Sequence, residues 1–243
     1  MKKTTQLIIV LALGVITSTQ AQFWGNKSIK GNGNMTTITR STADYDAISC
    51  AGSMDFILVK GHEGHIKIEG EENLLEYIVT EVKDDQLVVR VQHGISIRSS
   101  WNKGIKVTIP FENIHAVSLA GSGDVWNTST ITADNLNVTL SGSGDIKLEV
   151  NAKNLSSTIS GSGDITLTGT ADNLGTRVTG SGDFHGFDLQ ANNTEARVTG
   201  SGDIDVVSNQ SLVARVTGSG DIKYRGNPDK EDSKVTGSGS ISN

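Results

Sequence analysis

Apolar and polar residues alternate in the second half of the chain around a four-residue motif, Gly-Ser-Gly-Asp, that returns about every 19 residues. The motif itself never gains or loses a residue, and the variation in spacing falls between its copies. A coil with a fixed corner and tolerant loops has this signature. The first glycines of the copies, including a worn copy, GSGS, at the end, are Gly121, Gly142, Gly161, Gly180, Gly200, Gly218 and Gly237.

Four apolar columns keep register with the motif. They are Leu119, Leu140, Ile159, Val178, Val198, Val216 and Val235; Val125, Ile146, Ile165, Phe184, Ile204, Ile222 and Ile241; Leu148, Leu167, Val206 and Tyr224; and Leu136, Leu155 and Leu174. One unit cannot bury these side chains alone, but stacked units turn each column into a continuous ladder. The pattern therefore predicts an all-β protein, a β-solenoid with one GSGD corner in each coil of about 19 residues.

The first half of the chain predicts a less regular β region with one short helical turn. Its segment AISCAGSMDFILV, around Gly52, resembles AVSLAGSGDVWNT, around Gly121. This suggests one additional coil in which the motif is degenerate, GSMD in place of GSGD, and which we call the worn coil. Strands are expected near 56–60, 65–69, 77–83, 87–92 and 105–109, and a helical turn or two within 71–78. We expect a linker at 22–37 and a single solenoid domain at 38–243, with an irregular β cap at 38–115 and regular coils at 116–243.

The N-terminus has the features of a secretory signal peptide at residues 1–21. Lys2 and Lys3 precede an apolar run, and Thr19 and Ala21 place small residues before a cleavage site at Gln22. No later run is long and apolar enough to form a membrane-spanning helix. The sequence thus predicts export to the periplasm, the cell surface or the medium.

Charge argues against nucleic acid as a partner. The formal net charge is −6, and it becomes −8 once Lys2 and Lys3 are removed with the signal peptide. A nucleic-acid-binding protein needs a basic surface instead.

The repeated aspartates allow two interpretations. Glycine adopts positive φ without a clash, and Asp accepts backbone hydrogen bonds in turns, so GSGD can act purely as a corner. Stacking also places like charges at strand spacing, where they repel by about 0.9 kcal/mol per pair even in water, and Ca²⁺ could relieve this. The candidate cation column is Asp124, Asp145, Asp164, Asp183, Asp203 and Asp221.

A cationic column precedes the later motifs by three residues and points outward by the alternation. Together with neighbouring threonines, it could hold a glycan or a partner protein through charge and hydroxyl contacts. The alternative is a solvated face on which charge prevents aggregation. The column consists of Arg177, Arg197, Arg215 and Lys234.

Candidates for catalysis are few, and we predict no catalytic residue and no cofactor. Cys50 is the single cysteine and lies between apolar neighbours, which predicts a buried thiol. His62 and His65 are three residues apart without a third ligand or a helix. The motif serines do not match the G-x-S-x-G elbow, and Trp101 or Trp126 could stack on sugars but more often serve packing.

The segments DYDAISCAGSMDFILVKG, DDQLVVRV and IHAVSLAGSGDV, together with the serial GSGDI copies, resemble the putative auto-transporter adhesin family with a head GIN domain, which is frequent in Bacteroidetes. The resemblance covers about residues 40 to 240. It implies a right-handed, single-stranded β-helix and, by the family name, an adhesin-like role. Because the chain repeats one motif and shows no singular acid–base group, we expect an exported, non-enzymatic adhesin-like or ligand-binding module at the cell envelope. Two alternatives remain open: a carbohydrate-active β-helix enzyme, and a structural or protein-binding envelope component.

Overall fold

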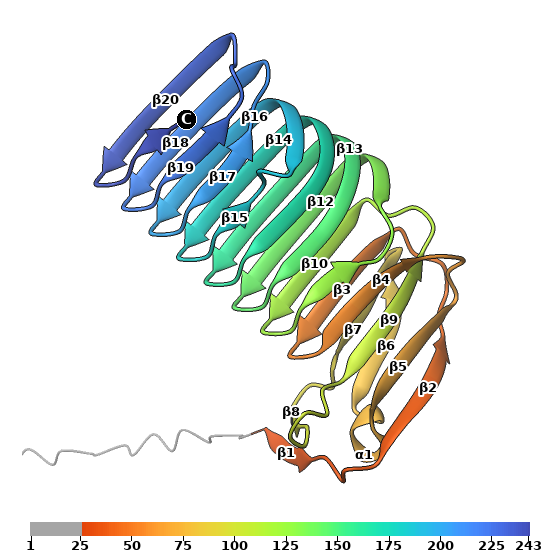
Figure 1. Cartoon of the computed structure of the whole chain (residues 1–243). Helices are drawn as coiled ribbons and strands as arrows, with labels where there is room; N and C mark the ends of the chain where they lie inside the picture. The colour runs from red at the N-terminus through yellow and green to blue at the C-terminus, as the bar shows by residue number, and fades with distance from the viewer. Residues whose placement is uncertain (1–25) are drawn as a thin grey trace, which may run out of the picture.

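The computed structural model describes residues 26–243, so the predicted signal peptide at 1–21 lies outside the described residues. The chain forms a β-solenoid of about seven turns, in which parallel coils stack into a rod, and the β-solenoid prediction is confirmed. The strands of the second half run side by side along this rod from green to blue in Figure 1.

Twelve strands build the regular coils. They are β10 (Ala116–Gly121), β11 (Val125–Asn127), β12 (Ile131–Gly142), β13 (Ile146–Gly161), β14 (Ile165–Gly180), β15 (Phe184–His185), β16 (Leu189–Gly200), β17 (Ile204–Val207), β18 (Ser211–Gly218), β19 (Ile222–Arg225), β20 (Lys230–Gly237) and β21 (Ile241–Ser242). Equivalent positions of successive coils pair in parallel, for example Leu140 with Ile159 and Gly142 with Gly161. The repeat thus sets the strand register.

The apolar columns form the core of the rod. In the column two residues before the motif, Leu119, Leu140 and Ile159 are each no more than 1% exposed, as are the members in the next three coils. Val235 is 40% exposed and departs from the prediction, because the coil that contains it has a neighbouring coil on one side only. Alternation along each strand therefore sorts side chains into core and surface.

The corner depends on direct backbone stacking of glycines. Gly142 has φ +131°, and the carbonyl oxygen of Gly121 below it accepts hydrogen bonds from the N–H groups of Ser143 and Gly144, at 2.9 and 3.0 Å. A Cβ on Gly144 would lie 1.9 Å from the carbonyl oxygen of Gly123. Glycine is thus required at this corner both for its conformation and for the approach of the next coil.

The predicted worn coil is confirmed. Strands β3 (Ala47–Gly52) and β4 (Asp55–Lys60) pair in parallel with β10 and β11, and Gly52 lies opposite Gly121. Cys50 is opposite Leu119 and fully buried, and this burial raises the pKa of its thiol. The cysteine therefore belongs to the core column of the first coil.

The remaining N-terminal elements close one end of the rod (Figure 1). They are β1 (Lys27–Lys30), β2 (Met35–Ser41), β5 (His65–Glu71), α1 (Glu72–Leu75), β6 (Ile78–Lys83), β7 (Gln86–Val91), β8 (Ile95–Arg98) and β9 (Lys106–Phe111). Strands β7 and β9 continue the parallel stack, whereas β2, β5 and β6 add antiparallel pairs. Antiparallel pairing covers strand edges that a bare coil would expose.

The stretch 22–37, expected to be a linker, differs from that expectation among its described residues. Lys27–Lys30 is strand β1, which pairs with β8, and the first residues of β2 pair with β5. The buried carboxylate of Glu71 holds this segment. It accepts hydrogen bonds from the N–H of Gly33 at 2.6 Å and from the N–H and hydroxyl of Ser100 at 2.7 and 2.6 Å.

The inward positions change character in β20. Glu231 lies opposite Leu212, and Ser233 lies opposite Ala214. The Glu231 carboxylate accepts hydrogen bonds from the hydroxyl groups of Tyr224, at 2.9 Å, and Ser233, at 2.7 Å. Inward-pointing charge is a known protection for strand edges, so this coil is poorly suited to receive an apolar coil on top of it.

The corner geometry predicts a sharp difference between two adjacent alanine substitutions. We expect Gly144→Ala to lower the free energy of unfolding by more than about 3 kcal/mol, because its Cβ meets backbone atoms that cannot move aside. The exposed neighbour provides the control, and Ser143→Ala should change stability by less than about 0.5 kcal/mol. Chemical denaturation measures both, and similar losses would show that glycine stacking does not limit the fold.

The Glu71 contacts predict a pH-dependent contribution to stability. Hydrogen bonds from Ser100 are the main reason that the pKa of Glu71 lies below its usual value of 4.5. The ionised carboxylate therefore stabilises the fold above pH 4.5, and this stabilisation is lost as the pH falls through the lowered pKa. Glu71→Gln should lower the melting temperature most at neutral pH, and the difference from the unsubstituted protein should shrink on acidification. Glu72→Gln, at an exposed neighbour, is the control, and a pH-independent difference would contradict this account.

Candidate binding surfaces

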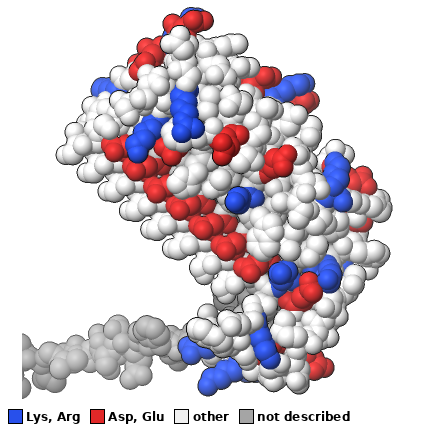
Figure 2. Space-filling model, viewed as in Figure 1, with Lys and Arg blue, Asp and Glu red and all other residues white. Residues whose placement is uncertain are grey.

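The motif aspartates form one continuous ladder along the rod. Asp145 donates its N–H to Oδ1 of Asp124 at 3.1 Å, and Asp164 donates to Asp145 at the same distance. The N–H groups of Asp183, Asp203 and Asp221 continue the series at 2.7 to 2.8 Å. Figure 2 shows an acidic line along the edge of the rod where these turns lie.

This ladder explains why the carboxylates tolerate one another. The sequence suggested a hydrogen bond within each turn, but the donor that each carboxylate receives belongs to the next coil. The column ends at Ser240, whose N–H and hydroxyl both donate to Asp221, at 2.7 and 2.9 Å. Each aspartate thus joins two coils, and backbone dipoles oppose the repulsion between neighbouring charges.

Asp55 occupies the equivalent position in the worn coil. Burial is the main reason that its carboxyl pKa is raised, and the negative charge of Asp124 adds to this effect. Lys106 and the backbone of Asp124 act in the opposite direction. At this N-terminal position, burial and the neighbouring Asp124 together disfavour the charged form of the carboxyl group.

One part of the acidic column has a histidine beside it. Ligand atoms of Asp164, Asp183 and His185 lie within 4.8 Å of one another, and they form the only such group of three among residues 26–243. The imidazole is 4.0 Å from carboxylate oxygens of both Asp164 and Asp205. Oxygen and nitrogen ligands of this kind suit a divalent cation, although Oδ1 of Asp164 and Asp183 already accepts a backbone N–H.

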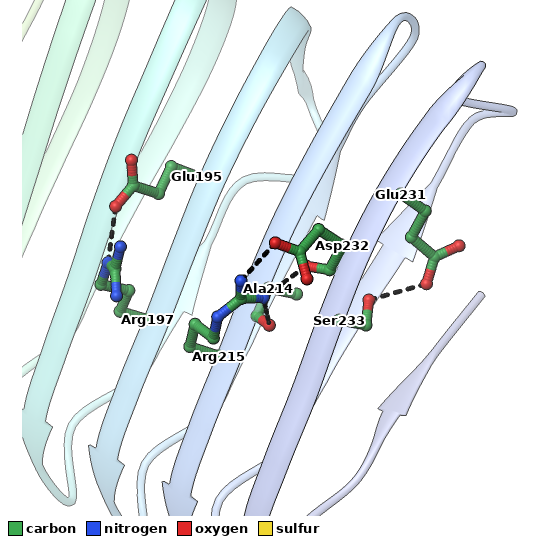
Figure 3. Close-up of polar contacts among 7 residues, drawn as sticks. All are labelled: Glu195, Arg197, Ala214, Arg215, Glu231, Asp232 and Ser233. Atoms are coloured by element: carbon green, nitrogen blue, oxygen red, sulfur yellow. Dashed lines mark hydrogen bonds and ion pairs between the residues drawn. The ribbon is translucent and has the colours of Figure 1, made fainter.

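The predicted cationic column is also in register. Arg177 pairs with Arg197, Arg197 with Arg215, and Arg215 with Lys234, and all four residues are at least partly exposed. Figure 3 shows that Arg197 contacts Glu195 on its own strand, while Arg215 contacts Asp232 on the next strand. The Arg197–Glu195 hydrogen bond measures 2.5 Å. None of the ion pairs formed within residues 26–243 includes Arg177 or Lys234.

The histidines and tryptophans singled out in the sequence do not converge on one site. His62 is exposed and lies 2.6 Å from Glu112, whose hydrogen bond raises the pKa of His62, whereas His65 lies near Ser41. Trp101 is 89% exposed, and Trp126 is half-buried on β11. Neither histidine belongs to the group of three potential ligands described above.

Stacked asparagines form another ladder, which was not predicted from the sequence. Asn154, Asn173 and Asn193 each donate from Nδ2 to Oδ1 of the asparagine one coil below, at 2.9, 2.8 and 3.1 Å, and the ladder starts at Asn135. Each of these asparagines stands seven residues before a motif glycine, so the signal was present in the sequence as a further polar column. Amide side chains can donate and accept at the same time, which makes a stacked column self-satisfying.

Beside the asparagine ladder lies a groove of about 770 Å³ that crosses several coils. Ala133, Ala152 and Ala171 lie along it, and polar side chains line it on both sides. Asp46, Asn113 and His115 also line it, at the end nearest the N-terminal region. Together with the acidic and cationic columns, this groove is a third candidate surface.

Substitutions of Asp164 distinguish a ladder held by hydrogen bonds from a column that binds a cation. The first comparison tests the hydrogen bond. Asp164→Asn keeps an oxygen that can accept the N–H of Asp183 and removes one charge, so we expect stability to be unchanged or higher. Asp164→Ala leaves that N–H without its acceptor and should cost about 1–2 kcal/mol in chemical denaturation.

Melting curves in EDTA and in millimolar calcium complete the comparison for Asp164. A calcium-dependent rise in melting temperature that is lost in Asp164→Asn would assign the column to a cation. Equal losses of stability for the two substitutions would contradict a purely hydrogen-bonding role.

Comparison with known proteins agrees with this architecture. A putative adhesin from Bacteroides fragilis superimposes with a TM-score of 0.81 at 28% identity, covering 88% of this chain and 99% of that one. A putative lipid binding protein from Parabacteroides distasonis gives 0.73 at 30% identity, covering 89% and 99%. A putative adhesin from Parabacteroides merdae gives 0.71 at 23% identity, covering 88% and 98%, which supports the fold alone.

The search of curated proteins found no match. In residues 26–243, no helix has the length and apolar character needed to cross a bilayer. Residues 44–228, well over half of the chain, match the family described as putative auto-transporter adhesin, head GIN domain. The chain therefore belongs to this family.

Proposed function

We propose that the protein is an exported, adhesin-like binding module of the cell envelope without enzymatic activity. The signal-peptide pattern of residues 1–21 supports export, and the family and its adhesin-like neighbours support a binding role. The observation that carries the proposal is the repetition of surface chemistry. Because coils stack in register, the same outward side chains recur at intervals of about 4.8 Å over several coils.

A repeated surface suits binding to an extended partner better than catalysis. A hydrolase or lyase concentrates a distinct acid and base in one cleft. Here the aspartates, asparagines and arginines recur from coil to coil, and many are engaged in ladders or ion pairs. Repetition gives many equivalent weak contacts, whose combined strength grows with the length of the partner.

The cationic column is the proposed contact for an acidic partner, either an anionic glycan or an envelope protein. Arg177 and Arg197 flank a small hollow of about 200 Å³ at Gly175, whose missing side chain leaves space for a ligand group. Guanidinium groups recognise carboxylate and sulfate-like groups through paired hydrogen bonds. Arg197 would have to exchange its contact with Glu195 for the ligand, which leaves Arg177 as the readier donor.

The proposal predicts both location and adhesion. The full chain, expressed in a host strain from which its gene is deleted, should appear in the envelope or medium and restore attachment to coated surfaces. A chain without residues 1–21 should remain inside the cell and restore nothing. Arg177→Thr with Lys234→Thr, which restores the threonine found at this position in earlier coils, should weaken attachment to acidic surfaces at least about tenfold.

Two results would contradict the proposed function. Correct export without any effect on attachment would indicate a structural envelope component. Release of reducing ends from polysaccharides by purified residues 22–243 would indicate a carbohydrate-active enzyme.

A further inference from the structure

The groove beside the asparagine ladder crosses successive coils at equivalent positions. Thr132, Asn151, Thr170 and Gln190 pair in register and form one side. The four coils that contribute these residues span about 14 Å along the rod. The groove therefore presents a row of hydroxyl and amide groups parallel to the axis of the solenoid.

The small side chains between the two sides keep the groove open. Ala133, Ala152 and Ala171 occupy the same position in three successive coils. Ala152 and Ala171 are only 6% and 5% exposed, so they lie beneath the polar side chains that surround them. The second side includes Asp134 and Lys153, which form an ion pair at 2.8 Å.

The charges of the groove disfavour an anionic ligand. Its lining includes three carboxylates, those of Asp46, Asp134 and Asp172, against a single lysine. Lys153 is already paired with Asp134, and His115 lies 3.5 Å from Asp46. An acidic polymer would meet uncompensated negative charge here, in contrast to the cationic column on the neighbouring face.

The backbone of the groove disfavours a peptide bound as an added strand. Strand addition needs a free sheet edge, but beside the groove β13 is paired with β12 on one side, from Val150 onward, and with β14 on the other. The remaining contacts are therefore side-chain hydroxyls and amides, which can donate and accept hydrogen bonds. The Thr170 hydroxyl already donates to Oδ1 of Asn151 at 2.9 Å, which leaves it free to accept. Sugar hydroxyl groups have the same dual capacity.

We propose that this groove binds an extended, neutral, hydroxyl-rich glycan that lies parallel to the axis of the rod. The inference deepens the proposed binding function, on which it rests, by naming the ligand class and the surface. Of the residues that line the groove in the described part of the chain, none is Trp, Tyr or Phe, so no ring stacks on the sugar. Affinity must then accumulate from hydrogen bonds along the ligand, and it should depend on ligand length.

The test uses purified residues 22–243 with defined neutral oligosaccharides: cello-, malto-, manno- and chito-oligosaccharides, from disaccharides to hexasaccharides. Calorimetry should show that at least one series binds, with hexasaccharides at least about tenfold tighter than disaccharides, equivalent to one or two added hydrogen bonds. Heparin and polygalacturonate serve as anionic probes. Affinity independent of length would contradict the groove as the site.

Two matched substitutions locate the binding. Thr170→Trp places a large side chain at an exposed position in the middle of the groove, where β-strands tolerate aromatic residues, and should abolish binding of neutral glycans. Thr179→Trp, also exposed and on the same strand, lies outside the groove and should leave binding unchanged. Equal melting temperatures of the two variants would show that both are folded.

The outcomes separate this inference from the proposed function. No binding of any neutral series, binding that survives Thr170→Trp, or neutral binding lost in Arg177→Thr would each overturn the groove assignment. If cells that express the full chain still attach to surfaces in any of these cases, the adhesive function stands and only the groove is wrong. If cells that express the unsubstituted full chain do not attach to surfaces, the proposed adhesive function itself is wrong.

Discussion

The structure depends on how closely two coils can approach at the GSGD corner. At each corner the carbonyl oxygen of one glycine accepts two N–H groups from the coil above, and no Cβ fits between the backbones. That approach sets the strand spacing for the whole coil, since every strand of the unit must pair at the same interval. A single side chain at the corner would separate the coils locally and weaken the pairing on either side of it.

Side-chain ladders extend this backbone stacking to the surface. Aspartates join coils at the corner by accepting the next backbone N–H, and asparagines join them within the long strands by amide-to-amide hydrogen bonds. The two ladders differ in charge and in the source of their hydrogen-bond donors. Each asparagine amide is neutral and both donates to and accepts from its neighbours in the column, whereas each aspartate needs a backbone N–H donor to offset the repulsion from its neighbours. The same register that buries the apolar columns therefore also fixes the polar ones.

The surfaces proposed for binding follow from this register. In-register stacking arranges the arginine column, the aspartate column and the polar groove as separate stripes along the rod. The acidic stripe is visible in Figure 2. A partner that extends along the rod meets one stripe over several coils. The charge difference between the groove and the arginine column means that one rod can present different faces to neutral and acidic partners.

The sequence by itself determined the solenoid, because a fixed motif at a nearly constant period with four apolar columns can bury its core only by stacking. It also determined the core membership of Cys50, the worn coil at Gly52 and the alignment of the aspartates and arginines. Only the tertiary structure decided the hydrogen-bond partners of those side chains. The donor to each aspartate and the acid beside Arg215 belong to a neighbouring coil, and the groove along the alanine column is lined by several coils. The distances between these groups depend on the spacing and curvature of the coils, which the sequence period does not specify. Five N-terminal strands were predicted to within two residues, but their pairing was not. Antiparallel pairing and a buried carboxylate such as Glu71 depend on contacts between segments that share no repeat.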